Sequence, residues 1–134
     1  MIGLDTNVLV RLLTADDAAQ LKTATQLIAG FAGQPGSFFI NELVLVELIW
    51  VLQRLYGYSQ PESLQAVQAL LASDAFVFED RTRLNQAVRL CNEKASGFAD
   101  AMIALKNAVT ACEYTATFDK DMVGLPKISL LTAC

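Results

Sequence analysis

The stretch Met1-Ile2-Gly3-Leu4-Asp5-Thr6-Asn7 determines how the rest of this chain is interpreted. Four mostly apolar residues end at the acid Asp5, and apolar residues at helical spacing begin directly afterwards, at Val8. This pattern predicts a short buried parallel strand followed by a helix. In open α/β sheets, ligands bind just beyond the carboxyl ends of the strands. We therefore expect Asp5 to lie at the floor of a functional site.

Strand and helix patterns alternate along the whole chain. The predicted strands cover residues 1–4, 37–40, 75–79, 113–117 and 128–131. Helical patterns follow Asp5 and cover about 14–31, 42–56, 59–71, 80–91 and 98–111. Such alternation is typical of a parallel sheet covered by helices, and 134 residues is the size of one domain. We predict an α/β fold, a single three-layer domain over 1–134 with a central parallel sheet of about five strands and helices on both faces.

The composition excludes several kinds of catalysis. The chain has no histidine, which removes serine and cysteine nucleophile systems that need a histidine base, and histidine-bound zinc. Its three cysteines are widely spaced and form no metal or disulfide pattern, so we expect small buried hydrophobes. No apolar run approaches the ~18 residues of a membrane span, and the N-terminus has no secretory pattern. We expect a cytoplasmic protein that does not bind membranes.

The net charge of −4 argues mildly against a nucleic-acid partner. However, 14 acids stand against 10 bases, so the charges balance if four acids bind a metal ion. A bound divalent cation also reverses the local field.

Four acids stand out from their surroundings. Glu47 has apolar neighbours at helical spacing, where a carboxylate would be costly to desolvate unless it meets a cation or donors; the alternative is a surface stripe shared with Arg54. Each of the other three also has an ordinary explanation: Asp5 as a helix N-cap, Asp100 as a first-turn acid and Asp119 as a turn residue.

Taken together, these acids point to one site. In a doubly wound sheet, strand ends and helix N-termini meet at one edge, so the four carboxylates would converge. Like charges that share a small volume raise one another's pKa and need a counter-charge. Oxygen ligands without histidine favour Mg²⁺ or Mn²⁺.

The motifs around these acids resemble the PIN-domain ribonucleases, and more narrowly the VapC-type toxins of type II toxin–antitoxin pairs. The resemblance covers essentially the whole chain and rests on Leu4-Asp5-Thr6-Asn7, Leu45–Leu52 around Glu47, Phe98-Ala99-Asp100-Ala101 and Thr117-Phe118-Asp119-Lys120-Asp121. Each motif is weak alone, but four in this order are fairly specific.

The resemblance implies a Mg²⁺-dependent endoribonuclease that hydrolyses RNA, with tRNA or another structured RNA as the suspected substrate. Asp5, Glu47, Asp100 and Asp119 would be the catalytic, metal-binding quartet. Asp121 would ligate beside Asp119 or in its place. Supporting polar residues would be Asn7 and Thr117.

The resemblance also implies a homodimer and a cognate antitoxin as partners. Parts of the apolar helix 42–56, including Trp50, are candidates for these interfaces, with plain core as the simpler explanation for most of its residues. Arg11 and Lys120 are candidate phosphate contacts, and Arg81 and Arg83 are weaker ones.

Three other interpretations of the sequence stay open. A phosphoacceptor signalling domain of the receiver type would also bind Mg²⁺, but Asp5 has no acidic neighbour and no lysine follows the last predicted strand. A phosphohydrolase with an aspartate nucleophile needs an acid where Asn7 stands. A non-catalytic PIN-like RNA-binding scaffold is disfavoured by the intact quartet.

Overall fold

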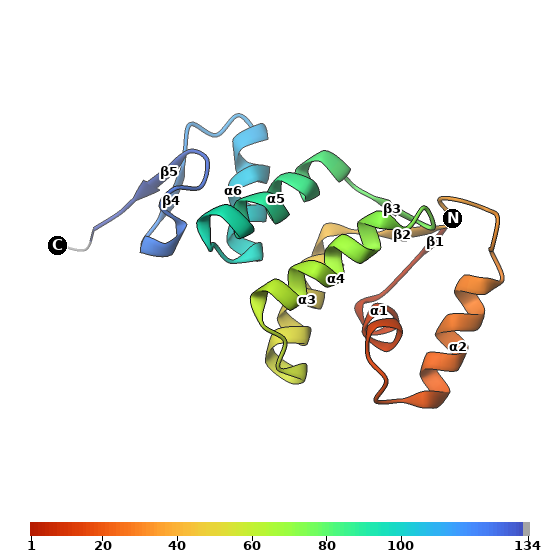
Figure 1. Cartoon of the computed structure of the whole chain (residues 1–134). Coiled ribbons are helices and arrows are strands. Elements are labelled where there is room, and N and C mark those ends of the chain that lie inside the picture. Colours follow the sequence, from red (N-terminus) through yellow and green to blue (C-terminus); the bar gives the residue numbers. More distant parts are fainter. Residues whose placement is uncertain (133–134) are drawn as a thin grey trace. The chain divides into compact units, whose positions relative to one another are not determined.

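Short parallel strands alternate with longer helices, which confirms the predicted α/β class (Figure 1). The structure is a computed structural model that describes residues 1–132. Its strands are β1 (Ile2–Gly3), β2 (Phe38–Ile40), β3 (Phe76–Phe78), β4 (Thr115–Thr117) and β5 (Ile128–Leu130). Its helices are α1 (Thr6–Leu13), α2 (Ala18–Ala29), α3 (Glu42–Tyr56), α4 (Gln60–Ala72), α5 (Arg81–Lys94), α6 (Phe98–Val109) and the short 3-10 helix η1 (Lys120–Met122).

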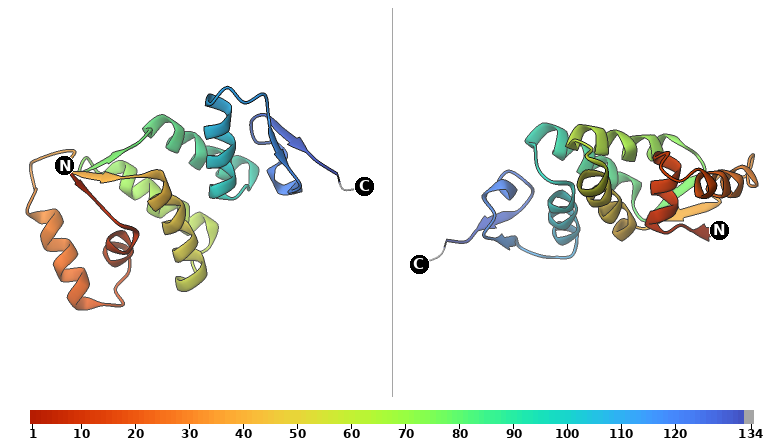
Figure 2. Two further views of the ribbon diagram at one scale, coloured as in Figure 1. Left: turned by 180° about the vertical axis from the view of Figure 1, so that it is seen from behind. Right: turned by 90° about the horizontal axis from the view of Figure 1, so that it is seen from below.

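The chain divides into two compact units, the first covering Met1–Glu79 and the second beginning at Asp80. The strands of the first unit form a parallel sheet in the order β1-β2-β3 and stay side by side when the view is turned (Figure 2). The second unit contains the parallel pair β4-β5. The five predicted parallel strands are confirmed, but they form two sheets where one was predicted. Each strand has only two or three residues, so it offers few backbone groups for pairing.

Helix α3 forms much of the core of the first unit, where it packs on α1 and α4. Leu45, Leu48 and Leu52 are fully buried and recur at helical spacing on its inner face. The side chain of Asn41 caps the helix by accepting a hydrogen bond of 2.9 Å from the Val44 amide. Local sequence therefore determines where this helix begins, and burial of its apolar face holds it in place.

The second unit is built on the contact between α5 and α6, and α6 also packs on β4. Leu84 and Ala87 of α5 are buried, as are Ala101 and Met102 of α6. Small side chains at such a contact allow two helices to pack closely. In the part of the chain that the structure describes, no helix is both long and apolar enough to span a bilayer.

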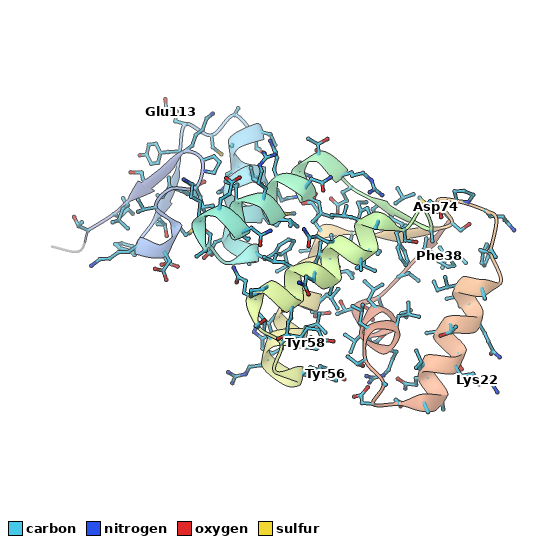
Figure 3. The ribbon with its side chains drawn as sticks, in the orientation of Figure 1. Lys22, Phe38, Tyr56, Tyr58, Asp74 and Glu113 are labelled. Atoms are coloured by element: carbon cyan, nitrogen blue, oxygen red, sulfur yellow. The ribbon has the colours of Figure 1, made fainter. Side chains whose placement is uncertain are left out.

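A polar network in the first unit joins three helices around the Arg11 guanidinium. Arg11 donates to the Tyr56 hydroxyl at 3.0 Å and to Asp16 at 3.1 Å, and its Nε donates to Gln20 at 2.5 Å. The Tyr56 hydroxyl in turn donates to Asp16 at 2.6 Å. Tyr56 lies at the C-terminal end of α3 (Figure 3). The network therefore ties the loop between α1 and α2 to the end of α3.

We expect Asp16→Asn to lower the urea midpoint of unfolding at pH 7. The hydrogen bond from Tyr56 lowers the pKa of the Asp16 carboxyl below 3.8 in the folded chain. A lowered folded pKa stabilises the fold above the unfolded pKa, and this contribution disappears as pH falls through the folded value. The difference in urea midpoint between the wild type and Asp16→Asn should therefore become smaller below pH 3.8. An unchanged difference from pH 7 down to pH 3 would contradict this role.

Candidate functional site

Asp5 follows β1 and serves as the N-cap of α1. Its Oδ1 accepts a hydrogen bond of 2.8 Å from the Thr6 amide, and the residue is exposed. Asn7 is also exposed, in the first turn of the same helix. Between them, the Thr6 hydroxyl is buried and has no hydrogen-bond partner among residues 1–132. The start of α1 thus combines an accessible carboxylate, an accessible amide and an unsatisfied hydroxyl.

Glu47 lies on the outward face of α3, in the same unit as Asp5. Of the two explanations that the sequence offered for Glu47, the structure favours the surface stripe: Glu47 and Arg54 are both exposed, so Glu47 is not desolvated. Two apolar neighbours of Glu47 are themselves exposed, Leu43 by 81% and Trp50 by 57%. The spacing of apolar residues located the helix correctly, but it did not distinguish the buried face from the exposed one.

Asp100 occupies the first turn of α6, which begins after Gly97. Burial raises the pKa of the Asp100 carboxyl, and the negative charges of Asp119 and Asp121 raise it further. A Cβ atom added at Gly97 would lie 3.4 Å from Asp100 Oδ2, so the backbone of the N-cap passes close to the carboxylate. This location favours a negative charge through the partial positive charge at a helix N-terminus.

Asp119 and Asp121 lie in a tight turn after β4. The Asp119 amide donates to the Thr117 hydroxyl at 3.0 Å, and the Asp121 amide donates to Asp119 Oδ1 at 2.8 Å. Asp119, Lys120 and Asp121 are all exposed. Thr117 therefore shapes the turn that presents the two acids, which is a more specific role than the supporting one that the sequence suggested.

Each unit contains part of the predicted site. The first contains Asp5, Asn7 and Glu47, and the second contains Asp100, Thr117, Asp119 and Asp121. The effect of two carboxylates on the Asp100 pKa places these three acids near one another. Within each unit, the described residues form no group of three or more acidic or cysteine side chains suited to holding a metal ion. The quartet as one site stays a prediction.

The donor set nevertheless fits a hard divalent cation. It consists of carboxylate, amide and hydroxyl oxygens, which Mg²⁺ and Mn²⁺ prefer. The neighbouring charges that act on Asp100 are both negative, so a cation would relieve their repulsion. The buried Thr6 hydroxyl beside Asp5 is an additional polar atom that lacks a partner in the described part of the chain.

The two predicted phosphate contacts differ in whether their side chains already make hydrogen bonds. Lys120 is exposed beside Asp119, whereas Arg11 is held in the network with Tyr56 and Asp16. Sequence spacing gave no signal for this network, since Tyr56 is 45 residues from Arg11. Both remain predicted phosphate contacts.

The comparisons with known proteins identify the family. The sequence matches the PIN domain over residues 2–128, which is nearly its whole length. The chain therefore belongs to the PIN domain family, as its motifs indicated. It is similar to a VapC ribonuclease from Aquifex aeolicus (strain VF5), with 23% identity over 103 residues that cover 77% of this chain and 76% of the relative. Among solved structures, a toxin-antitoxin complex from Klebsiella pneumoniae aligns with 18% identity and a TM-score of 0.34, covering 96% of each chain.

The cysteines of the second unit differ in solvent exposure. Cys91, on α5, is buried with 3% of its surface exposed, as predicted, whereas Cys112 is half-buried. Cys134 lies outside the described residues. Burial raises the pKa of the Cys91 thiol to about 11, and the negative charge of Asp100 adds to this shift.

We expect Cys91 to be unreactive at pH 8 in the folded chain, because thiol reagents attack the thiolate. The measurement is the rate of Ellman's reagent with Cys112→Ser/Cys134→Ser, in which Cys91 alone remains. The matched chain, Cys91→Ser/Cys134→Ser, retains Cys112 and should react at least about tenfold faster. In denaturant the two rates should converge. Equal rates in the native state would show that Cys91 is accessible.

Proposed function

We propose that this chain is a metal-dependent endoribonuclease that acts as the toxin of a toxin–antitoxin pair. The observation that carries the proposal is the family match over residues 2–128, which includes all four acids of the predicted quartet. The similar Aquifex aeolicus protein is named a VapC ribonuclease. The lack of histidine agrees with hydrolysis that relies on carboxylates and a metal ion.

In the proposed site, Asp5, Asp100 and Asp119 would hold one or two Mg²⁺ or Mn²⁺ ions. Glu47 would ligate directly or through water, and Asp121 would contribute beside Asp119 or in its place. A bound Mg²⁺ ion supplies a water of lowered pKa and neutralises charge that develops on the phosphoryl oxygens.

The remaining roles belong to side chains of this protein. Glu47 or Asp100 accepts the proton of the attacking water. Thr117 keeps its turn in the shape that presents Asp119, through the hydrogen bond that its hydroxyl accepts. Lys120 and Arg11 contact phosphates of the RNA. Cleavage by water leaves a 5′-phosphate, unlike cleavage that uses the 2′-hydroxyl.

The test is incubation of total RNA or tRNA with the wild-type chain and with Asp5→Asn, each with Mg²⁺ and with EDTA. We expect cleavage only by the wild type with Mg²⁺. Loss of a metal ligand should reduce the rate by at least about 100-fold, because even partners of ligands contribute 10–100-fold. A 5′-phosphate-dependent exonuclease should then degrade the products.

The matched control is Asp80→Asn. Asp80 is also a helix N-cap, and its side chain accepts a hydrogen bond of 2.8 Å from the Arg83 amide. Asparagine caps helices about as well as aspartate, so both variants should keep the wild-type melting temperature, and only Asp5→Asn should lose cleavage. Full Mg²⁺-dependent activity in Asp5→Asn would refute the assignment. Wild-type RNA binding without cleavage would favour the non-catalytic scaffold.

We also propose a homodimer and a cognate antitoxin as partners of this chain. Helix α3 has exposed apolar side chains that suit such contacts. Leu43 is 81% exposed, Trp50 is 57% exposed and Leu55 is 67% exposed. Where exposed apolar side chains form a contiguous patch, the patch commonly marks a protein contact. Light scattering of the isolated chain should give a dimer mass, and Trp50→Glu should shift it towards the monomer. A monomeric wild type at high concentration would contradict the dimer.

A further inference from the structure

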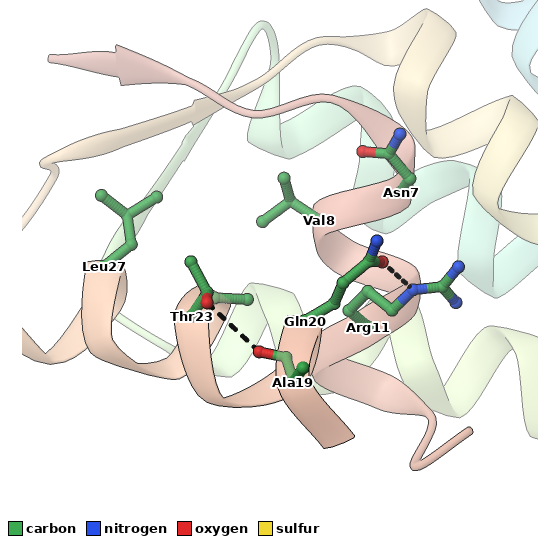
Figure 4. A pocket seen from close by; sticks show the side chains of 8 residues that line it. Asn7, Val8, Arg11, Ala19, Gln20, Thr23 and Leu27 are labelled. Carbon is green, nitrogen blue, oxygen red and sulfur yellow. Dashed lines mark hydrogen bonds between the residues drawn. The ribbon is translucent and has the colours of Figure 1, made fainter. Parts of the chain in front are cut away.

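We propose that the pocket between α1 and α2 is a subsite for one nucleotide of the RNA, next to the bond that is cut. The inference rests on the proposed ribonuclease function and adds where the substrate is held. The pocket lies wholly within the first unit, with Asn7, Val8 and Arg11 on its α1 side and Gln20, Thr23 and Leu27 on its α2 side (Figure 4).

The pocket begins close to Asp5 along the chain. Asn7 lines the pocket and follows Asp5 by two residues. Two peptide units separate their Cα atoms by at most about 7.6 Å, which is the scale of one nucleotide. An RNA phosphate beside Asp5 can therefore place its neighbouring base in the pocket.

The size of the pocket suits one nucleoside. Its volume is about 520 Å³, which falls within the range of roughly 300–1,000 Å³ typical of small-molecule sites. The walls are mostly apolar, with Val8 on one side and Ala24 and Leu27 on the other. Apolar walls of this kind accept the faces of a planar base, while a few polar groups determine its orientation.

Polar groups for reading a base line the same pocket. The Asn7 amide makes no hydrogen bond within residues 1–132, and Gln20 uses only its oxygen, which accepts from Arg11. Side-chain amides pair with base edges through one donor and one acceptor. Arg11 is already oriented by Asp16 and Tyr56, so binding would require little additional ordering of its side chain.

A base fits these groups better than an apolar side chain from a partner protein does. An apolar occupant would displace water from the Asn7 and Gln20 amides without replacing its hydrogen bonds, which disfavours binding. A base supplies both an apolar face and a polar edge. We therefore commit to a nucleotide as the occupant.

The test compares two variants on α2 that differ only in position. Thr23 is exposed and lines the pocket, whereas Thr25 is exposed on the same helix and does not line it. Thr23→Phe should fill the pocket, and Thr25→Phe should leave it open. The probes are AMP, GMP, CMP and UMP, titrated into each ¹⁵N-labelled chain in EDTA and followed by NMR. Binding is thus measured without cleavage.

We expect at least one nucleotide to shift amide signals of α1 and α2 in the wild type. Thr23→Phe should weaken this binding at least tenfold, while Thr25→Phe should stay within twofold of the wild type. With Mg²⁺ and RNA, Thr23→Phe should also change the distribution of cut sites. If Thr23→Phe lowers the melting temperature, Gln20→Leu is used as the test variant instead. The order in which Gln20→Leu prefers the four nucleotides should differ from that of the wild type.

Two outcomes would overturn the inference while the ribonuclease proposal stands. One is wild-type RNA cleavage with nucleotide shifts outside α1 and α2, together with an unchanged cut pattern in Thr23→Phe. The other is that the wild type binds no nucleotide but binds an apolar dye, and that Thr23→Phe abolishes the dye binding. That outcome would identify the pocket as a protein-docking groove. Nucleotide binding in the pocket without any wild-type cleavage would instead refute the ribonuclease proposal, and with it the position of the pocket next to a cut bond, and would leave a nucleotide-binding pocket.

Discussion

Repulsion between carboxylates is the constraint on which the candidate site depends. In the second unit, Asp100 is partly buried and lies within the electrostatic reach of Asp119 and Asp121, which raise its pKa. Two features of the fold offset this repulsion. Asp100 sits in the first turn of α6, where the helix favours negative charge, and the Asp121 amide donates to Asp119. These contacts hold the acids in place, and a divalent cation would complete the compensation.

In the first unit, one short helix carries most of the functional candidates. Asp5 caps α1, Asn7 lies in its first turn and Arg11 lies near its end. The network with Tyr56 anchors the end of this helix to α3, while pairing of β1 with β2 positions its start. Because both ends are held, the groups along α1 keep a constant spacing.

Helix α3 combines two roles on two faces. Its inner face, with Leu45, Leu48 and Leu52 fully buried, forms the core of the first unit. Its outer face carries Glu47 between apolar residues that remain exposed, including Trp50. These exposed apolar side chains are the ones proposed above to contact partner proteins.

The sequence by itself determined the α/β class, the approximate limits of the elements, the N-cap position of Asp5 and the family. These features depend on residues close together in the chain, whose periodicity and hydrogen-bonding groups act locally. Only the tertiary structure decided that Glu47 is exposed, that the strands pair as two sheets and that Arg11 is held by Tyr56. Those outcomes depend on which elements pack together across tens of residues, and local patterns carry no record of that packing.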